Sequence, residues 1–155
     1  MAGGGRQWRP PPDAWAALAI AAALLLEWLW PLGLLPPPGV AVSGVGIVIL
    51  LAGLALEMAS ARALIFAGTT TKAGAEPQAL VTTGPFAKSR NPFYIGLLLV
   101  MAGLFVATGL DWGVLALPLL WLALDLRVIP FEEQRLAAAF GDEYRSYAAR
   151  VRRWL

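Results

Sequence analysis

Long apolar stretches with few charges constrain the fold of this chain more than any other feature. A membrane-spanning helix needs roughly 20 mostly apolar residues. Of the 155 residues, 59% are hydrophobic and 14% are charged, and the mean hydropathy is +0.67, outside the usual range of soluble proteins. We therefore expect one all-α domain over residues 1–155, a polytopic membrane helical bundle with about four transmembrane helices and a cytoplasmic C-terminal helical segment. The expected spans cover about residues 13–35, 40–66, 93–109 and 114–130.

The basic residues predict how these spans are oriented. All twelve Lys and Arg residues lie in the N-terminal segment, at the end of span two or in the long connector after it, or from the end of span four onward. The two short turns, 31–39 and 110–113, contain none. By the positive-inside rule, both termini and the long connector are cytoplasmic, which requires an even number of spans. The first stretch lacks a small-residue cleavage site and is expected to be retained. The Ala/Gly/Arg-rich composition is typical of GC-rich bacterial DNA, so we expect a multi-pass protein of a bacterial inner membrane.

Cysteine and histidine are both absent, which limits the possible chemistry. Disulfides, thiolate nucleophiles and Cys/His metal sites are excluded, and so is an imidazole base. We expect no metal centre. The formal charge of +2 is explained by basic residues that flank the spans, so nucleic acid is not an expected partner.

Small residues and charges within the apolar stretches carry further information. Gly96 and Gly103 lie seven residues apart on one helix face, and Gly103 with Ala107 forms a pair that favours close helix packing. Charges inside a span are costly. For Glu27 and Glu57 we expect structural pairing rather than catalysis.

The end of span four gathers charges of both signs. Asp125 and Glu132 share one helical stripe, and Arg127 precedes Glu132 and Glu133 by about a turn and a half. Two interpretations remain open at this point. The set could be a salt-bridge network at the membrane interface, or it could bind a zwitterion, with Arg on a carboxylate and Glu on an ammonium group.

The long connector between spans two and three ends in a polar turn that leads into span three. It delivers Arg90, Asn91 and Tyr94 to the start of that span, and Pro92 is well placed for a first helical turn. The backbone amides behind a helix N-terminus can receive an anionic group. On these grounds the turn is either an anchor or a ligand site.

Several short motifs together resemble the isoprenylcysteine carboxyl methyltransferase and phospholipid methyltransferase superfamily of integral membrane enzymes. That superfamily carries Gly-Pro-aromatic, Arg-His-Pro-x-Tyr-x-Gly, Glu-Glu-x-x-Leu and Phe-Gly-x-x-Tyr motifs, followed by a basic end. The matching residues, between Gly68 and the C-terminus, are Gly84, Pro85, Phe86, Arg90, Asn91, Pro92, Phe93, Tyr94, Gly96, Glu132, Glu133, Leu136, Phe140, Gly141, Tyr144, Tyr147, Arg152, Arg153 and Trp154.

The resemblance implies S-adenosylmethionine as methyl donor, held within a cofactor region at residues 84–155. It implies that the donor contacts Phe86, Arg90, Asn91, Pro92, Phe93, Tyr94, Glu132 and Glu133, and that Arg127 and Glu132 are catalytic, orienting the substrate or stabilising charge near the reacting centre. One position departs from the motif, because Asn91 stands where the superfamily commonly has His. Asn can hydrogen-bond but does not titrate near neutrality, so proton transfer at this position is not expected.

The resemblance also implies a lipid bilayer environment and a lipidic or small apolar methyl acceptor. An isoprenylated thiol carboxylate, a phospholipid amine, and a small apolar thiol or amine are all candidates. Methyl transfer from a sulfonium is an in-line displacement that positioning can accelerate without a metal or a thiol. Two alternatives remain, an NADPH-dependent enzyme like the sterol reductases and a non-catalytic membrane scaffold.

Overall fold

The computed structural model describes residues 12–34, 38–69 and 76–155, and every regular element in these ranges is a helix. The expectation of an all-α fold is therefore confirmed. The elements in chain order are α1 (Pro12–Leu29), α2 (Val40–Phe66), the 3₁₀ turn η1 (Gly84–Ala87), α3 (Pro92–Thr108), α4 (Gly113–Ala123), the π-helical turn η2 (Leu124–Val128) and α5 (Ile129–Arg150).

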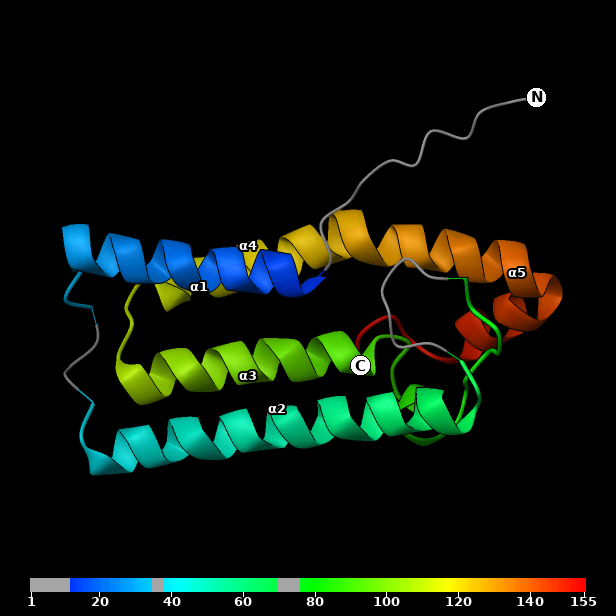
Figure 1. The fold of residues 1–155 in the computed structure, drawn as a ribbon, viewed down its shortest axis with the longest axis horizontal. Helices are drawn as coiled ribbons and strands as arrows, with labels where there is room; N and C mark the ends of the chain where they lie inside the picture. Colours follow the sequence, from blue (N-terminus) through cyan, green and yellow to red (C-terminus); the bar gives the residue numbers. More distant parts are fainter. Residues whose placement is uncertain (1–11, 35–37, 70–75) are drawn as a thin grey trace, which may run out of the picture.

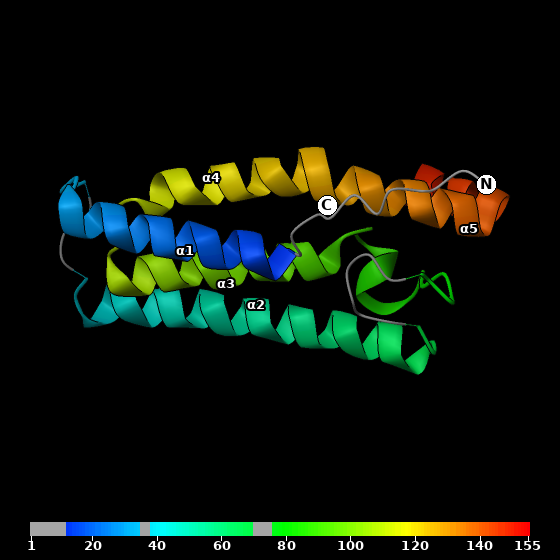
Figure 2. The same ribbon diagram turned by 45° about the horizontal axis from the view of Figure 1, so that its top comes forward.

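The long helices run alongside one another in two layers (Figures 1 and 2). One layer holds α1, packed on α4, and the other holds α2, packed on α3. A hydrophobic core lies where α1, α3 and the helix beginning at α4 meet. Its buried members are Ala16, Ala23, Tyr94, Met101, Phe105, Leu120, Leu124 and Ile129. This core fixes the start of α3 against the helix that carries Glu132.

Two helices of the described chain are long and apolar enough to cross a membrane. They are α2 and the continuous helix Gly113–Arg150, whereas the apolar helices Ala14–Leu29 and Pro92–Thr108 are shorter. Large apolar side chains such as Ile47, Val48 and Leu51 are exposed along α2. Such a surface is unfavourable in water and is expected on a helix that contacts lipid.

The first helix ends earlier than predicted. We expected a span to about residue 35, but α1 ends at Leu29. Pro31 has no backbone N–H, and a proline disfavours helical geometry in the residue before it. The predicted second span, 40–66, coincides with α2, and the third, 93–109, is offset by one residue from α3.

Glycines allow α2 and α3 to approach closely. A Cβ atom built on Gly53 would lie 2.7 Å from the carbonyl oxygen of Gly96, and one on Gly103 would lie 2.6 Å from that of Gly46. The Ser43 hydroxyl also donates a hydrogen bond of 3.0 Å to the Ala107 carbonyl across the same interface. The packing role predicted for Gly96, Gly103 and Ala107 is confirmed.

The fourth predicted span does not stop at Pro130. The helix passes from α4 through η2 into α5 without a break, and the Ile129 N–H donates to the Leu124 carbonyl five residues earlier. A proline removes one helical hydrogen bond and crowds the carbonyl four residues before it. The wider π turn immediately before Pro130 accommodates this defect.

The chain then turns back at Gly141. This residue has φ 51° and ψ −120°, a conformation that a side chain would strain, and it separates two arms of α5. In Figure 1 the second arm returns toward the start of α3, near which the C-terminus lies. The turn therefore brings the last residues of the chain back to the bundle.

The opposite end of the bundle is tied by polar contacts. The Asp111 side chain, 3% exposed, accepts a 2.9 Å hydrogen bond from the Leu34 N–H, and the Trp112 indole donates one of 2.9 Å to the Trp30 carbonyl. These bonds join the α1–α2 connection to the α3–α4 connection.

Candidate active site

The turn before α3 is built to present Arg90 and Asn91. Gly84, at φ 61°, begins η1, and Pro92 occupies the first turn of α3, where its missing N–H costs no helical hydrogen bond. The Ser89 hydroxyl accepts a 3.0 Å hydrogen bond from the Asn91 N–H. Ser89 and Asn91 are 1% and 8% exposed, so the turn is enclosed by other parts of the chain.

Residues 151–155, here called the C-terminal strap, form part of that enclosure. The Arg90 N–H donates to the Arg152 carbonyl at 2.9 Å. The Arg153 carbonyl accepts from the Asn91 side-chain amide at 2.9 Å and from the Ser89 hydroxyl at 3.2 Å. The strap thus satisfies polar groups of the turn that precedes α3.

Tyr94 and Glu132 form a direct pair between α3 and α5. The Tyr94 hydroxyl, on a side chain that is 5% exposed, donates a 2.7 Å hydrogen bond to Glu132 Oε1. Burial raises the pKa of the Glu132 carboxyl above its usual value, while the Tyr94 hydrogen bond and the charge of Arg135 oppose that rise. A buried carboxylate of this kind gains from a cation placed beside it.

Glu133 instead belongs to an ion-pair network. Arg90 Nη2 lies 2.7 Å from Glu133 Oε1, and Arg153 Nη2 lies 2.7 Å from Glu133 Oε2. Arg153 also reaches Asp125 at 3.2 Å, and the Trp154 indole donates to the same Asp125 oxygen at 2.9 Å. The two adjacent glutamates therefore differ, since Glu133 lies between two guanidinium groups and Glu132 accepts from a phenol.

An open pocket of about 400 Å³ adjoins this network. It is lined by Arg90, Pro130, Glu133, Gln134, Ala137, Tyr144 and Ala148. Arg90 donates to the Ala148 carbonyl and to Glu133, but its buried Nε has no hydrogen-bond partner within the described chain. A buried donor without a partner carries a free-energy cost that an oxygen-bearing ligand could relieve.

Aromatic side chains surround the same region. The rings of Phe93 and Tyr94 meet edge to face with centroids 6.3 Å apart, and Phe86 is half-buried in η1. The Tyr147 hydroxyl donates to the Phe86 carbonyl at 2.8 Å. Burial raises the pKa of Tyr147 to about 12, so this hydroxyl stays protonated. The contact fixes η1 against the returning arm of α5.

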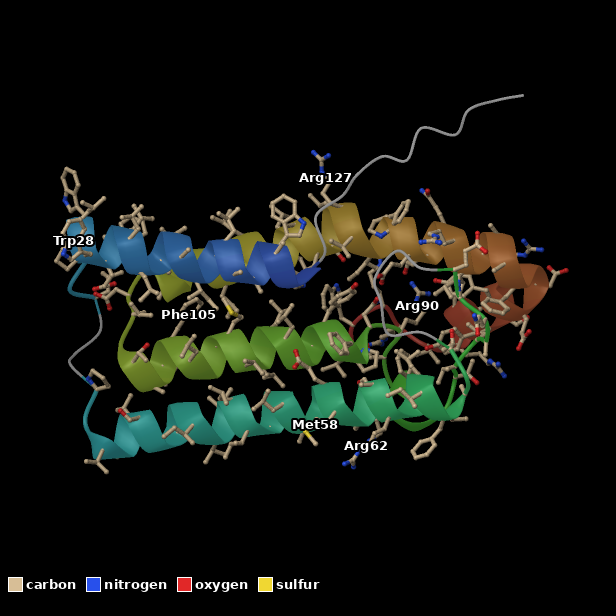
Figure 3. The ribbon with its side chains drawn as sticks, viewed as in Figure 1. Trp28, Met58, Arg62, Arg90, Phe105 and Arg127 are labelled. Carbon is tan, nitrogen blue, oxygen red and sulfur yellow. The ribbon has the colours of Figure 1, made fainter. Side chains whose placement is uncertain are left out.

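Most of the predicted site residues come together, but Arg127 lies apart. Phe86, Arg90, Asn91, Pro92, Phe93, Tyr94, Glu132 and Glu133 belong to η1, the turn after it, the start of α3, or the facing part of α5. Figure 3 shows Arg127 pointing away from the bundle on the outer side, whereas Arg90 lies between the two layers. Arg127 is exposed. Asp125 and Glu133 do meet basic groups, but their partners are Arg90 and Arg153 and not the expected Arg127.

No contact of Arg153 was predicted from the sequence. It appeared only in the basic end of the matched motifs, because helical spacing carries no sign that the chain reverses at Gly141. Ser89 was missed for a related reason, since its partner is a backbone carbonyl 64 positions away. Contacts of this range depend on the tertiary fold and leave no local pattern.

The turn before α3 and the facing part of α5 offer opposite charges to a ligand, because Arg90 binds Glu133 and the buried Glu132 is the adjacent residue of α5. Arg90 can bind a carboxylate or phosphate, and Glu132 can bind an ammonium or sulfonium group. Such a set suits a zwitterionic ligand.

Comparisons with known proteins show which family the sequence is similar to. The sequence model of the phospholipid methyltransferase family matches residues 42–143, about two thirds of the chain. An uncharacterized protein of Haemophilus influenzae is 39% identical over 64 residues, which cover 40% of this chain and 98% of that protein. No solved structure matches the chain significantly. The family match begins in α2 and ends before Tyr144, so the C-terminal strap lies outside it.

Proposed function

Because the chain belongs to the phospholipid methyltransferase family, whose members are S-adenosylmethionine-dependent membrane methyltransferases, we propose that it methylates a lipidic or small apolar acceptor at the membrane boundary. The observation that carries the proposal is that α5 sets two adjacent glutamates against the start of α3, with Glu132 bonded to Tyr94 and Glu133 bonded to Arg90 at an open pocket. A lipidic acceptor would reach this end of the bundle laterally, while a soluble donor would enter from the cytoplasm.

The residues present fit a donor that carries both signs of charge. S-adenosylmethionine supplies an electrophilic methyl group on a sulfonium, together with an ammonium and a carboxylate. Glu132, which accepts a hydrogen bond from Tyr94, would hold the ammonium group, and the unpartnered Nε of Arg90 would donate to the carboxylate. Displacement at a sulfonium needs chiefly alignment of donor and acceptor, and rigid helices provide that alignment.

The remaining residues that were predicted to contact the donor pack against it or shape the site in this proposal. Phe86 and Phe93 would pack against apolar parts of the donor. Asn91 and Pro92 are buried, and the Asn91 amide is engaged by the strap, so these residues would shape the site rather than react. Glu133 would hold Arg90 in place.

Arg127 would act on the acceptor. It is exposed on the outer side of the helix, just before the end of the predicted fourth span. A long cationic side chain at that depth extends toward the headgroup region. We propose that Arg127 orients the acceptor through a polar or anionic headgroup, with Glu132 on the donor side.

The membrane arrangement is part of the proposal. All four long helices would cross the bilayer, with both termini and the Tyr94–Glu132 end in the cytoplasm. Among the described basic residues, Arg62, Lys88, Arg90 and those from Arg127 onward come from elements at this end of the bundle. That distribution follows the positive-inside rule.

Calorimetry with S-adenosylhomocysteine tests the donor site. The purified protein should bind it, and Glu132→Gln should weaken binding at least tenfold, because the amide removes the negative charge from a buried position. Glu143→Gln is the matched control, since Glu143 is an exposed carboxylate of the same helix. Absence of binding by the wild type, with binding of NADPH instead, would refute the proposal. Incubation with labelled donor and a lipid extract of the host should then identify the acceptor.

A further inference from the structure

The C-terminal strap makes contacts that a simple end of a helix would not need. Through its main chain, the strap binds the turn before α3 at Ser89, Arg90 and Asn91. Through the Arg153 and Trp154 side chains, it binds acidic residues of the π turn and of α5. It is therefore bonded to both of the segments that form the proposed donor site.

Arg153 is the residue that joins the two sets of contacts. Its guanidinium bridges Glu133 and Asp125, and its carbonyl accepts from Asn91 and Ser89. The planar guanidinium is suited to this bridge, because it presents several donors in a fixed geometry, whereas a lysine presents a single point charge. The side chain is 34% exposed, which leaves it partly open to solvent.

The bridge also separates the roles of the two adjacent glutamates. Glu133 is neutralised by Arg153 and Arg90 together, so it offers little net charge to a ligand. Without the Arg153 side chain, Glu133 would keep an uncompensated part of its negative charge and would repel a carboxylate that approaches Arg90. Asp125 would also lose its paired guanidinium, and the strap, whose main-chain carbonyl at position 153 holds the Asn91 amide, would lose the ion pairs that fix it.

We propose that Arg153 is a positioning residue for the methyl donor, holding Glu133 on Arg90 and the strap on Asn91 so that Arg90 and Glu132 receive the donor. This inference rests on the proposed function. It concerns a residue that lies beyond the end of the family match at residue 143.

The test compares Arg153→Ala, Arg153→Lys and Arg150→Ala with the wild type. Arg150 is an exposed arginine at the end of α5 whose guanidinium donates to the Ser146 carbonyl of its own helix, so its removal controls for the loss of one positive charge. S-adenosylhomocysteine affinity is measured by calorimetry. KM for donor and acceptor and kcat are measured with labelled donor.

Arg153→Ala should weaken S-adenosylhomocysteine binding and raise the donor KM by tenfold or more. The acceptor KM, and kcat at saturating donor, should stay within about twofold of the wild type, which a general loss of structure would not produce. Arg153→Lys should restore part of the affinity through one ion pair. Arg150→Ala should match the wild type.

Three results would overturn the inference. They are an unchanged donor affinity in Arg153→Ala, a loss confined to kcat, and an equal loss in Arg150→Ala. If Arg153→Ala does not fold in detergent, Arg153→Lys decides, and a wild-type donor KM in that variant refutes the role. A wild-type protein that binds no S-adenosylhomocysteine would instead refute the proposed function itself, so the two failures are distinguishable.

Discussion

Replacing Tyr94 by Phe should change the pH dependence of donor binding. Phe keeps the ring in its buried position but removes the hydroxyl that donates to Glu132 at 2.7 Å. That hydrogen bond lowers the pKa of Glu132 against the opposing effect of burial. Without it the pKa rises further, so the carboxylate loses its charge at a higher pH as the solution is acidified. Binding of a ligand that places its ammonium group on Glu132 should be lost at that higher pH.

The size of the effect follows from the kind of hydrogen bond. A hydrogen bond to a charged group contributes about 1.5 to 3 kcal/mol. One pKa unit corresponds to about 1.4 kcal/mol, as does a tenfold change in affinity. We therefore expect the acidic limit, the pH below which S-adenosylhomocysteine binding weakens, to rise by about one unit. Below that limit the affinity of the variant should be about tenfold lower than that of the wild type.

Calorimetric titrations between about pH 5 and pH 9 would measure this shift. Tyr147→Phe is the matched control, because it removes another buried phenol whose partner is the Phe86 carbonyl and not Glu132. That variant should lose stability without moving the acidic limit. If Tyr94→Phe leaves the limit where it is in the wild type, then Glu132 is not the group whose ionisation governs binding, and the reasoning fails.

Two further predictions concern other parts of the molecule. Gly103→Leu should separate α2 from α3, because even a Cβ atom there would lie 2.6 Å from the Gly46 carbonyl oxygen. Overpacking of this kind costs about 1 to 3 kcal/mol or more, so thermal unfolding in detergent should occur at a clearly lower temperature. Gly44→Ala is the control, because a Cβ atom at Gly44 meets no atom within 4 Å, and it should not lower the unfolding temperature. Arg127→Ala should raise the acceptor KM several-fold and leave S-adenosylhomocysteine affinity unchanged; a weaker donor affinity would mean that Arg127 serves the donor instead.

The helices were largely predictable because their signals are local. Apolar length and the positions of proline and glycine predicted α2 to the residue and α3 to within one, and the glycine spacing predicted close packing on one face of α3 but not that α2 is the partner. The early end of α1 could have been read from Pro31. The passage of the helix through Pro130 could not, because it depends on the π turn at residues 124–128, which has no distinctive sequence pattern.

The candidate site was predictable in its members but not in its pairings. Motifs identified Tyr94, Glu132 and Glu133, yet nothing in their spacing assigned Glu132 to a phenol and Glu133 to two arginines. That division depends on the direction in which α5 faces α3 and on the reversal at Gly141. The position of Arg127 is a different case, because its spacing of about a turn and a half from Glu132 and Glu133 already places it on roughly the opposite side of the helix.

The position of the strap in the sequence also determines when, during synthesis, the turn before α3 can be held in place. Translation produces residues 151–155 after every helix that they join, so the contacts with Ser89, Arg90 and Asn91 form only once the rest of the described chain has been made. A nascent chain could insert all its helices before it could hold the turn ahead of α3. Under the proposed function, donor binding would therefore follow the synthesis of all the described helices, and premature termination after α5 would leave a chain that cannot hold this turn.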